Sequence, residues 1–214
     1  MRRDRLLIAV AAVGVLLAVA LVVAVLVAAR GSERQPQAGG PPPGPYRGSE
    51  PPAHLAAADF RLRSYRGRDV SLRAQRGSVV LLSFVDTKCT EKCPIVTSVM
   101  AQAYRLLPPE ERRQVVPLFI SVQPHADTLA HVRRFLARRH ALALDYLIGS
   151  VRQLRPVWKA YGIVAAVDTG NADVHSSDVR VIDRRGFWVA TQHAGVDLTA
   201  QNLAHDALEA LTRS

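Results

Sequence analysis

The chain is poor in lysine, cysteine and aromatic residues. Only 3 of its 28 basic residues are lysines, 2 of its 214 residues are cysteines, and 6% are aromatic. The formal net charge of +10 would suit a nucleic-acid partner. Such surfaces interleave cations with exposed rings, however, and that pattern is missing, so we predict no nucleic-acid binding. Because no second cysteine pair exists, the composition also argues against a structural zinc site.

The charge-free apolar run near the N-terminus is long enough to cross a membrane. It covers Leu6–Ala29, and as a helix it would be roughly 36 Å long against a hydrocarbon core of ~30 Å. Three arginines within residues 1–5 precede it, and basic flanks of this kind stay in the cytoplasm. We therefore predict a cytoplasmic tail over 1–5, a transmembrane anchor over 6–29, and an extracytoplasmic remainder of a single-pass cell-membrane protein.

A cleaved signal peptide is the alternative, with the small residues 27–29 preceding the cut. The apolar part of a signal peptide usually has about 7–15 residues, which is shorter than this run. Residues 30–55 are rich in Gly, Pro, Ser and charge. Since such a composition builds no core, we predict a tether there, followed by one folded domain over 56–214.

The folded domain is predicted to begin with a hairpin over Phe60–Leu72 and a strand over Val79–Val85. The second segment is almost continuously apolar, as in strands that are covered on both faces. Pro94 suits the first turn of the helix that follows, and Val115–Val122 is the next buried strand. The apolar residues expected to face inward from that helix are Ile95, Val99, Tyr104 and Leu107.

A second helix is predicted after Asp127 and Thr128, which offer an N-cap for it. Its periodicity gives an apolar face directed inward and a basic face that we interpret as solvated surface. The inward set is Leu129, Val132, Phe135 and Leu136, and the outward set is Arg133, Arg134, Arg138 and Arg139.

The remaining elements are a strand over Leu144–Ile148, a helix capped by Ser150, a hairpin over Val179–Thr191, and a helix over Leu198–Leu211. Alternating strands and helices followed by a hairpin and a helix indicate a mixed α/β sheet with helices on both faces. This order resembles the thioredoxin-like fold, here with an N-terminal hairpin extension.

The two cysteines, Cys89 and Cys93, lie where the strand ending at Val85 meets the helix at Pro94. Sites in α/β sheets occur at such strand ends. The helix N-terminus and the neighbouring Lys88 and Lys92 are both expected to favour thiolates. The pair could close as a structural disulfide, although a cross-link around so short a loop removes little entropy from the unfolded chain. Exchange chemistry or the binding of one soft metal ion suits this spacing better.

A metal bound by two thiolates needs a further ligand, and the chain has seven histidines. His175 is the favoured candidate and His125 the second, because the chain order places both near the cysteine end of the sheet. Two thiolates and one imidazole suit Cu(I) and also hold Cu(II). The two methionines, Met1 and Met100, are too few for a methionine-lined copper site.

Several ordered segments together resemble the Sco (SenC) family of membrane-anchored, thioredoxin-like copper proteins, over roughly Phe60–Leu211. Beyond the Cys-x-x-x-Cys-Pro motif, the matching segments are Ser83-Phe84-Val85-Asp86-Thr87, Ile120-Ser121-Val122 with Pro124 and Asp127-Thr128, Val157-Trp158-Lys159-Ala160-Tyr161-Gly162, and Val174-His175-Ser176 before Val181-Ile182-Asp183.

The resemblance implies that Cys89, Cys93 and His175 bind one copper ion. It further implies a metallochaperone for cytochrome c oxidase, with oxidase subunit II or another copper-acceptor protein as partner. That role is a carrier's and not a conventional enzyme's. The alternative is a thiol-disulfide oxidoreductase that keeps partner cysteines reduced, with Cys89 and Cys93 as its redox pair and no need for His175.

Overall fold

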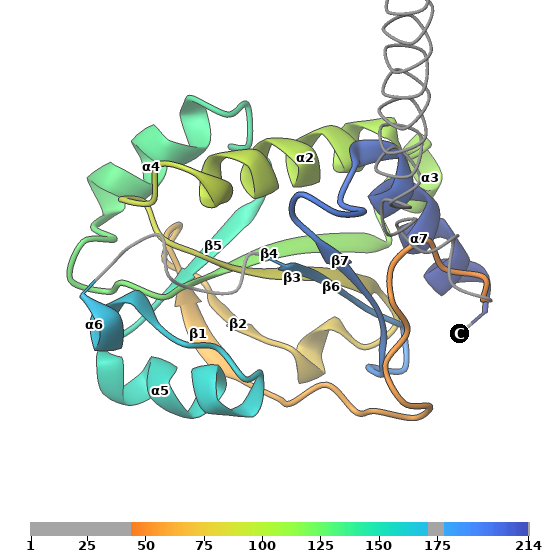
Figure 1. The fold of residues 1–214 in the computed structure, drawn as a ribbon, viewed down its shortest axis with the longest axis horizontal. Coiled ribbons are helices and arrows are strands. Elements are labelled where there is room, and N and C mark those ends of the chain that lie inside the picture. Colours follow the sequence, from red (N-terminus) through yellow and green to blue (C-terminus); the bar gives the residue numbers. More distant parts are fainter. Residues whose placement is uncertain (1–43, 171–177, 214) are drawn as a thin grey trace, which may run out of the picture. The chain divides into compact units, whose positions relative to one another are not determined.

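The computed structural model describes residues 44–170 and 178–213, in which a seven-stranded mixed sheet carries helices on both faces (Figure 1). The order of the strands across the sheet is β2-β1-β5-β4-β3-β6-β7. Their bounds are β1 Arg61–Ser64, β2 Asp69–Ser71, β3 Val79–Val85, β4 Val115–Ser121, β5 Asp145–Ile148, β6 Asp178–Ile182 and β7 Trp188–His193.

The three central strands, β5, β4 and β3, run parallel, and the outer strands pair antiparallel. Val85 at the end of β3 pairs with Ser121 at the end of β4. The loops that leave these two strands therefore emerge side by side at one edge of the sheet, which is where ligands bind in open α/β sheets.

Helices α2, α4 and α7 lie on one face of the sheet, and α5 and α6 lie on the other (Figure 1). The bounds of the helices are α2 Lys92–Leu106, α3 Pro109–Arg112, α4 Leu129–Ala137, α5 Val151–Ala160, α6 Ala166–Thr169 and α7 Ala200–Thr212, with a 3-10 turn η1 at Arg73–Gln75. Ser150 caps α5 as predicted, in a reciprocal capping box with Gln153.

Strand β3 is buried along its whole length and supplies both hydrophobic cores. Val79, Leu81 and Val85 pack with α2, α4 and α7, whereas Val80 and Leu82 pack with α5. Successive side chains of a strand point to opposite faces. The prediction of a strand covered on both faces is therefore confirmed.

Three orientations predicted from helical periodicity are wrong. Ile95 and Leu129 were expected to face inward, yet their side chains are 55% and 49% exposed. Arg139 was expected to point into solvent, but its guanidinium lies 3.9 Å from the centre of the Phe135 ring. The reason for Arg139 is that α4 ends at Ala137, so the residues after it no longer follow the helical period.

The predicted tether is too long at its C-terminal end, because part of it packs against the domain. Tyr46 is buried, and Ser49 forms a β-bridge with Thr191 of β7. The Arg47 and Gly48 N–H groups donate to the buried carboxylate of Asp206 in α7, at 2.7 and 3.0 Å. The folded unit therefore begins by Tyr46 and not at residue 56.

The predicted anchor, Leu6–Ala29, and the predicted ligand His175 lie outside the described residues. Within residues 44–170 and 178–213, none of the helices has the length and apolarity that a membrane crossing requires.

Candidate metal centre

Both cysteines lie where the chain passes from the end of β3 into α2. Cys89 is on the connecting loop, and Cys93 is the second residue of α2. Their side chains are 3% and 0% exposed, and they are not joined as a disulfide. The sequence prediction of a cysteine pair at a central strand end and a helix N-terminus is confirmed.

Backbone N–H groups are directed at the two sulphur atoms. The Cys93 N–H donates to Cys89 Sγ at 3.2 Å, and the Asp86 N–H donates to Cys93 Sγ at 3.4 Å. Glu91, at the N-cap position of α2, makes no side-chain hydrogen bond to the helix. The bond to Cys89 Sγ therefore satisfies one of the N–H groups at the start of α2 that have no partner within the helix. The loop thus holds two soft sulphur donors close together, which is the donor set that copper(I) accepts.

The surroundings of Cys93 oppose its ionisation. The hydrogen bond with Cys89, followed by burial, raises the pKa of the Cys93 thiol far above the ordinary value for cysteine. The prediction that Lys88 and Lys92 help to make Cys93 a thiolate is therefore wrong. Both lysines are exposed and their charges are screened by water, whereas the Cys93 side chain has no exposed surface.

A buried carboxyl group, that of Asp127, holds the start of the cysteine loop. Its Oδ1 accepts a hydrogen bond from the Thr87 N–H at 3.0 Å. Its Oδ2 lies 2.5 Å from Ser121 Oγ and 2.7 Å from Tyr146 Oη. Burial raises the pKa of Asp127 against the opposing effect of these bonds. The loop is thereby tied to the end of β4 and to the start of β5.

Sequence reasoning missed this function of Asp127, which it placed at a helix cap together with Thr128. Thr128 alone caps α4, by accepting a hydrogen bond from the His131 N–H. The available signal was position: Asp127 follows β4, which ends at the same sheet edge as β3, so an acidic residue there can reach the loop that carries Cys89.

The described histidines do not complete a ligand set with the cysteines. His125 is exposed, and residues 44–170 and 178–213 contain no cluster of three His, Cys, Asp or Glu side chains that could hold a metal. His131 Nδ1 lies 2.7 Å from the Ala126 carbonyl oxygen, and His54 contacts the Phe187 ring edge to face. The second-ranked candidate, His125, is therefore not brought to the cysteine loop.

Comparison with known proteins points to one family. The SCO1/SenC family model matches residues 48–211. A bovine mitochondrial SCO2 homologue is 36% identical over 112 residues, which cover 52% of this chain and 42% of the relative. The chain thus spans less than half the length of this relative.

Solved structures agree in fold. The Bradyrhizobium japonicum ScoI structure with copper bound is 25% identical, covers 73% of this chain and 100% of its own, and has a TM-score of 0.63. BsSco, described as a Sco-family cytochrome c oxidase assembly protein with a disulfide switch, is 23% identical, covers 78% and 99%, and has a TM-score of 0.64.

The thioredoxin-like prediction is confirmed in the same way. The thioredoxin domain of a thiol-disulfide oxidoreductase from Bacteroides vulgatus matches 73% of this chain and 95% of its own, with a TM-score of 0.56. At 15% identity this match shows the fold alone.

Proposed function

This chain belongs to the SCO1/SenC family, and we propose that it carries one copper ion to an acceptor protein during the assembly of cytochrome c oxidase. The observation that carries the proposal is the pair of buried cysteine side chains, not joined as a disulfide, where the loop after β3 enters α2. The copper-bound ScoI structure, which shares this fold, supports the choice of metal.

In this proposal Cys89, Cys93 and His175 are the ligands of the copper. The thiols lose their protons as the metal binds, which is how a buried thiol with a raised pKa becomes a ligand. Copper then leaves by ligand exchange: a donor atom of the acceptor replaces one sulphur at a time, and the oxidation state of the metal does not change. Oxidase subunit II is the proposed acceptor.

Location is part of the same proposal. The apolar run over 6–29 anchors the protein in the cell membrane, with the basic residues of 1–5 on the cytoplasmic side. The metal centre then works on the extracytoplasmic side, where a membrane-bound oxidase subunit is within reach of a tethered domain.

The test is the copper content of the full chain, purified with reductant and loaded with Cu(I) or Cu(II). Four single variants are compared with it: Cys89→Ala, Cys93→Ala, His175→Ala and His125→Ala. We expect one copper per chain, its loss in either cysteine variant, weaker retention in the His175 variant, and full retention in the His125 control. Far-ultraviolet circular dichroism of each variant checks that the fold is intact.

Two results would contradict the proposal. If the reduced, folded chain holds no copper, it is not a carrier, and turnover of a partner disulfide without metal would support the oxidoreductase alternative. If His125→Ala releases copper and His175→Ala does not, the carrier function stands but the third ligand is assigned wrongly.

A further inference from the structure

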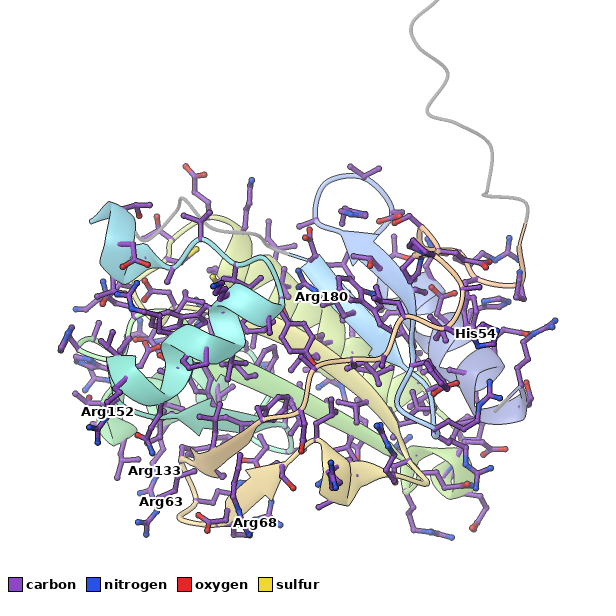
Figure 2. The ribbon with its side chains drawn as sticks, turned by 90° about the horizontal axis from the view of Figure 1, so that it is seen from below. His54, Arg63, Arg68, Arg133, Arg152 and Arg180 are labelled. Carbon is purple, nitrogen blue, oxygen red and sulfur yellow. The ribbon has the colours of Figure 1, made fainter. Side chains whose placement is uncertain are left out.

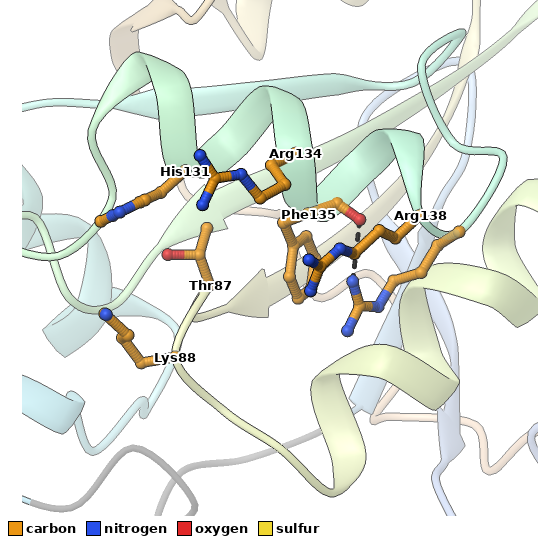
Figure 3. Close-up of a pocket in the computed structure, with 7 residues that line it drawn as sticks. Thr87, Lys88, His131, Arg134, Phe135 and Arg138 are labelled. Atoms are coloured by element: carbon orange, nitrogen blue, oxygen red, sulfur yellow. Dashed lines mark hydrogen bonds between the residues drawn. The ribbon is translucent and has the colours of Figure 1, made fainter.

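A basic pocket lies between the cysteine loop and α4. Its cavity is about 210 Å³. Thr87 and Lys88, which directly precede Cys89, form one wall, and residues of α4 and the turn after it form the other (Figure 3). The polar residues of this basic pocket are Thr87, Lys88, His131, Arg134, Arg138 and Arg139.

The charge of the basic pocket is of one sign. Four of its lining residues are lysine or arginine, and no carboxylate lines it. Among the ion pairs of residues 44–170 and 178–213, none involves any of these four cations. Arginines elsewhere on the surface do form ion pairs; Arg155, for example, pairs with Asp168 at 2.9 Å.

One polar atom at the wall of the basic pocket, Arg139 Nε, is buried without a hydrogen-bond partner. The Arg139 guanidinium is nevertheless held in place, because Nη1 donates to the Phe135 carbonyl oxygen at 2.8 Å and the group lies over the Phe135 ring. Burial, and then the neighbouring charge of Arg138, lower the pKa of Arg139. The guanidinium groups that line the basic pocket carry several N–H donors each, which a carboxylate can accept as charge-assisted hydrogen bonds.

We propose that the basic pocket binds an acidic side chain of the protein that docks at the cysteine loop. The cavity is smaller than the ~300–1,000 Å³ typical of pockets for drug-sized ligands, so it suits one or two carboxylates. Lys88 is adjacent to Cys89, so an acidic segment seated here brings the docking protein to the sulphurs. This identification of the occupant as a docking protein rests on the proposed carrier function.

The test measures binding of a fluorescent peptide of alternating Asp and Gly to the full chain, beside its Asn-for-Asp counterpart and inorganic sulfate. The variant is Arg134→Gln with Arg138→Gln. The matched control is Arg63→Gln with Arg133→Gln, which removes the same charge from two exposed arginines that do not line the basic pocket (Figure 2).

We expect the Asp peptide to bind, with affinity falling as salt rises, and the Asn peptide not to bind. The Arg134/Arg138 variant should lose about tenfold in affinity, whereas the Arg63/Arg133 control should change less than about twofold. Equal losses in both double variants, or equal binding of the two peptides, would overturn the proposal. Binding of sulfate alone would do the same, since it would make this a site for small anions.

Copper content, measured on the same samples, separates this inference from the carrier function. A chain that holds copper but ignores the Asp peptide refutes the acidic docking site only. A chain that binds the peptide through the basic pocket but holds no copper refutes the carrier function and leaves the pocket as an acidic-segment site. The Arg134/Arg138 variant should hold the same amount of copper as the unmodified chain, because neither arginine is a proposed ligand.

Discussion

Replacing Asp127 with Ala should destabilise the folded unit strongly, although Asp127 is not a proposed copper ligand. The substitution removes the acceptor of the Thr87 N–H and the partner of Ser121 Oγ. It also removes one of the two partners of Tyr146 Oη, whose other partner is the Val85 carbonyl oxygen at 2.9 Å. The cysteine loop then loses its main attachment to β4 and β5.

The magnitude follows from the groups that lose their partner. Leaving a buried donor unsatisfied costs ~1–3 kcal/mol. The Thr87 N–H and the Ser121 O–H are two such donors, although Ser121 Oγ still accepts a hydrogen bond from the Gln123 N–H at 3.3 Å. Part of this loss is offset, because the substitution also removes the cost of burying the Asp127 carboxyl group, which raises its pKa. We therefore expect a loss of about 2–4 kcal/mol, a large fraction of the ~5–15 kcal/mol that stabilises a typical domain.

Urea unfolding followed by tryptophan fluorescence measures this loss. Both tryptophans, Trp158 and Trp188, lie in the folded unit, so the signal reports on that unit in the full chain. A slope of about 2 kcal/mol per molar urea converts the expected loss into a midpoint shift of about 1–2 M. The control is Asp168→Ala, which removes an exposed ion pair and should shift stability by less than about 1 kcal/mol. An Asp127→Ala shift no larger than the control's would refute the reasoning.

Two further predictions concern Asp127 ionisation and the N-terminal segment of the folded unit. Because burial raises the pKa of Asp127, the folded state keeps a proton that the unfolded chain has released, so stability should fall as pH rises from the ordinary carboxyl pKa through the folded-state pKa. Asp127→Asn should flatten the dependence of the unfolding free energy on pH, measured by urea titrations across this range. An unchanged dependence would mean that other groups cause it. A Cβ on Gly48 would lie 2.5 Å from the Thr191 carbonyl oxygen, so Gly48→Ala should cost about 1–3 kcal/mol and expose Arg47 to trypsin. The control is Gly44→Ala, where the added Cβ meets the flexible Glu50 side chain. Equal cleavage of both variants would contradict the close approach of Gly48 to Thr191.

The strands and the cysteine motif were predictable because their signals are local. The apolar run over Val79–Val85 fixes both the strand and its burial, and Pro94 marks the first turn of α2. Of the four residues expected to face inward from this segment, Leu107 is buried and Val99 and Tyr104 pack against the core, but Ile95 is 55% exposed. The buried stripe of α2 consists instead mostly of small or sulphur-containing residues, namely Cys93, Val96, Thr97, Met100, Ala101 and Ala103.

Contacts between distant segments escaped sequence reasoning. The Arg47 and Gly48 N–H groups are held by Asp206, which lies more than 150 positions later in the chain. No local pattern distinguishes such a segment from a tether, because its Pro and Gly content is that of a linker. The basic pocket escaped for a related reason: it needs the chain to end α4 at Ala137 and fold Arg139 back over Phe135.

The parallel pairing of β3 with β4 explains why the cysteine loop, its carboxyl anchor and the basic pocket occur together. Val85 pairs with Ser121, and the Val122 N–H donates to the Val85 carbonyl oxygen at 3.1 Å, so both strands end at the same level. The loop after β3 carries Cys89, and the loop after β4 carries Asp127 before entering α4. Because Thr87 both donates to Asp127 and lines the basic pocket, an occupant of that pocket would contact the segment that positions the sulphurs.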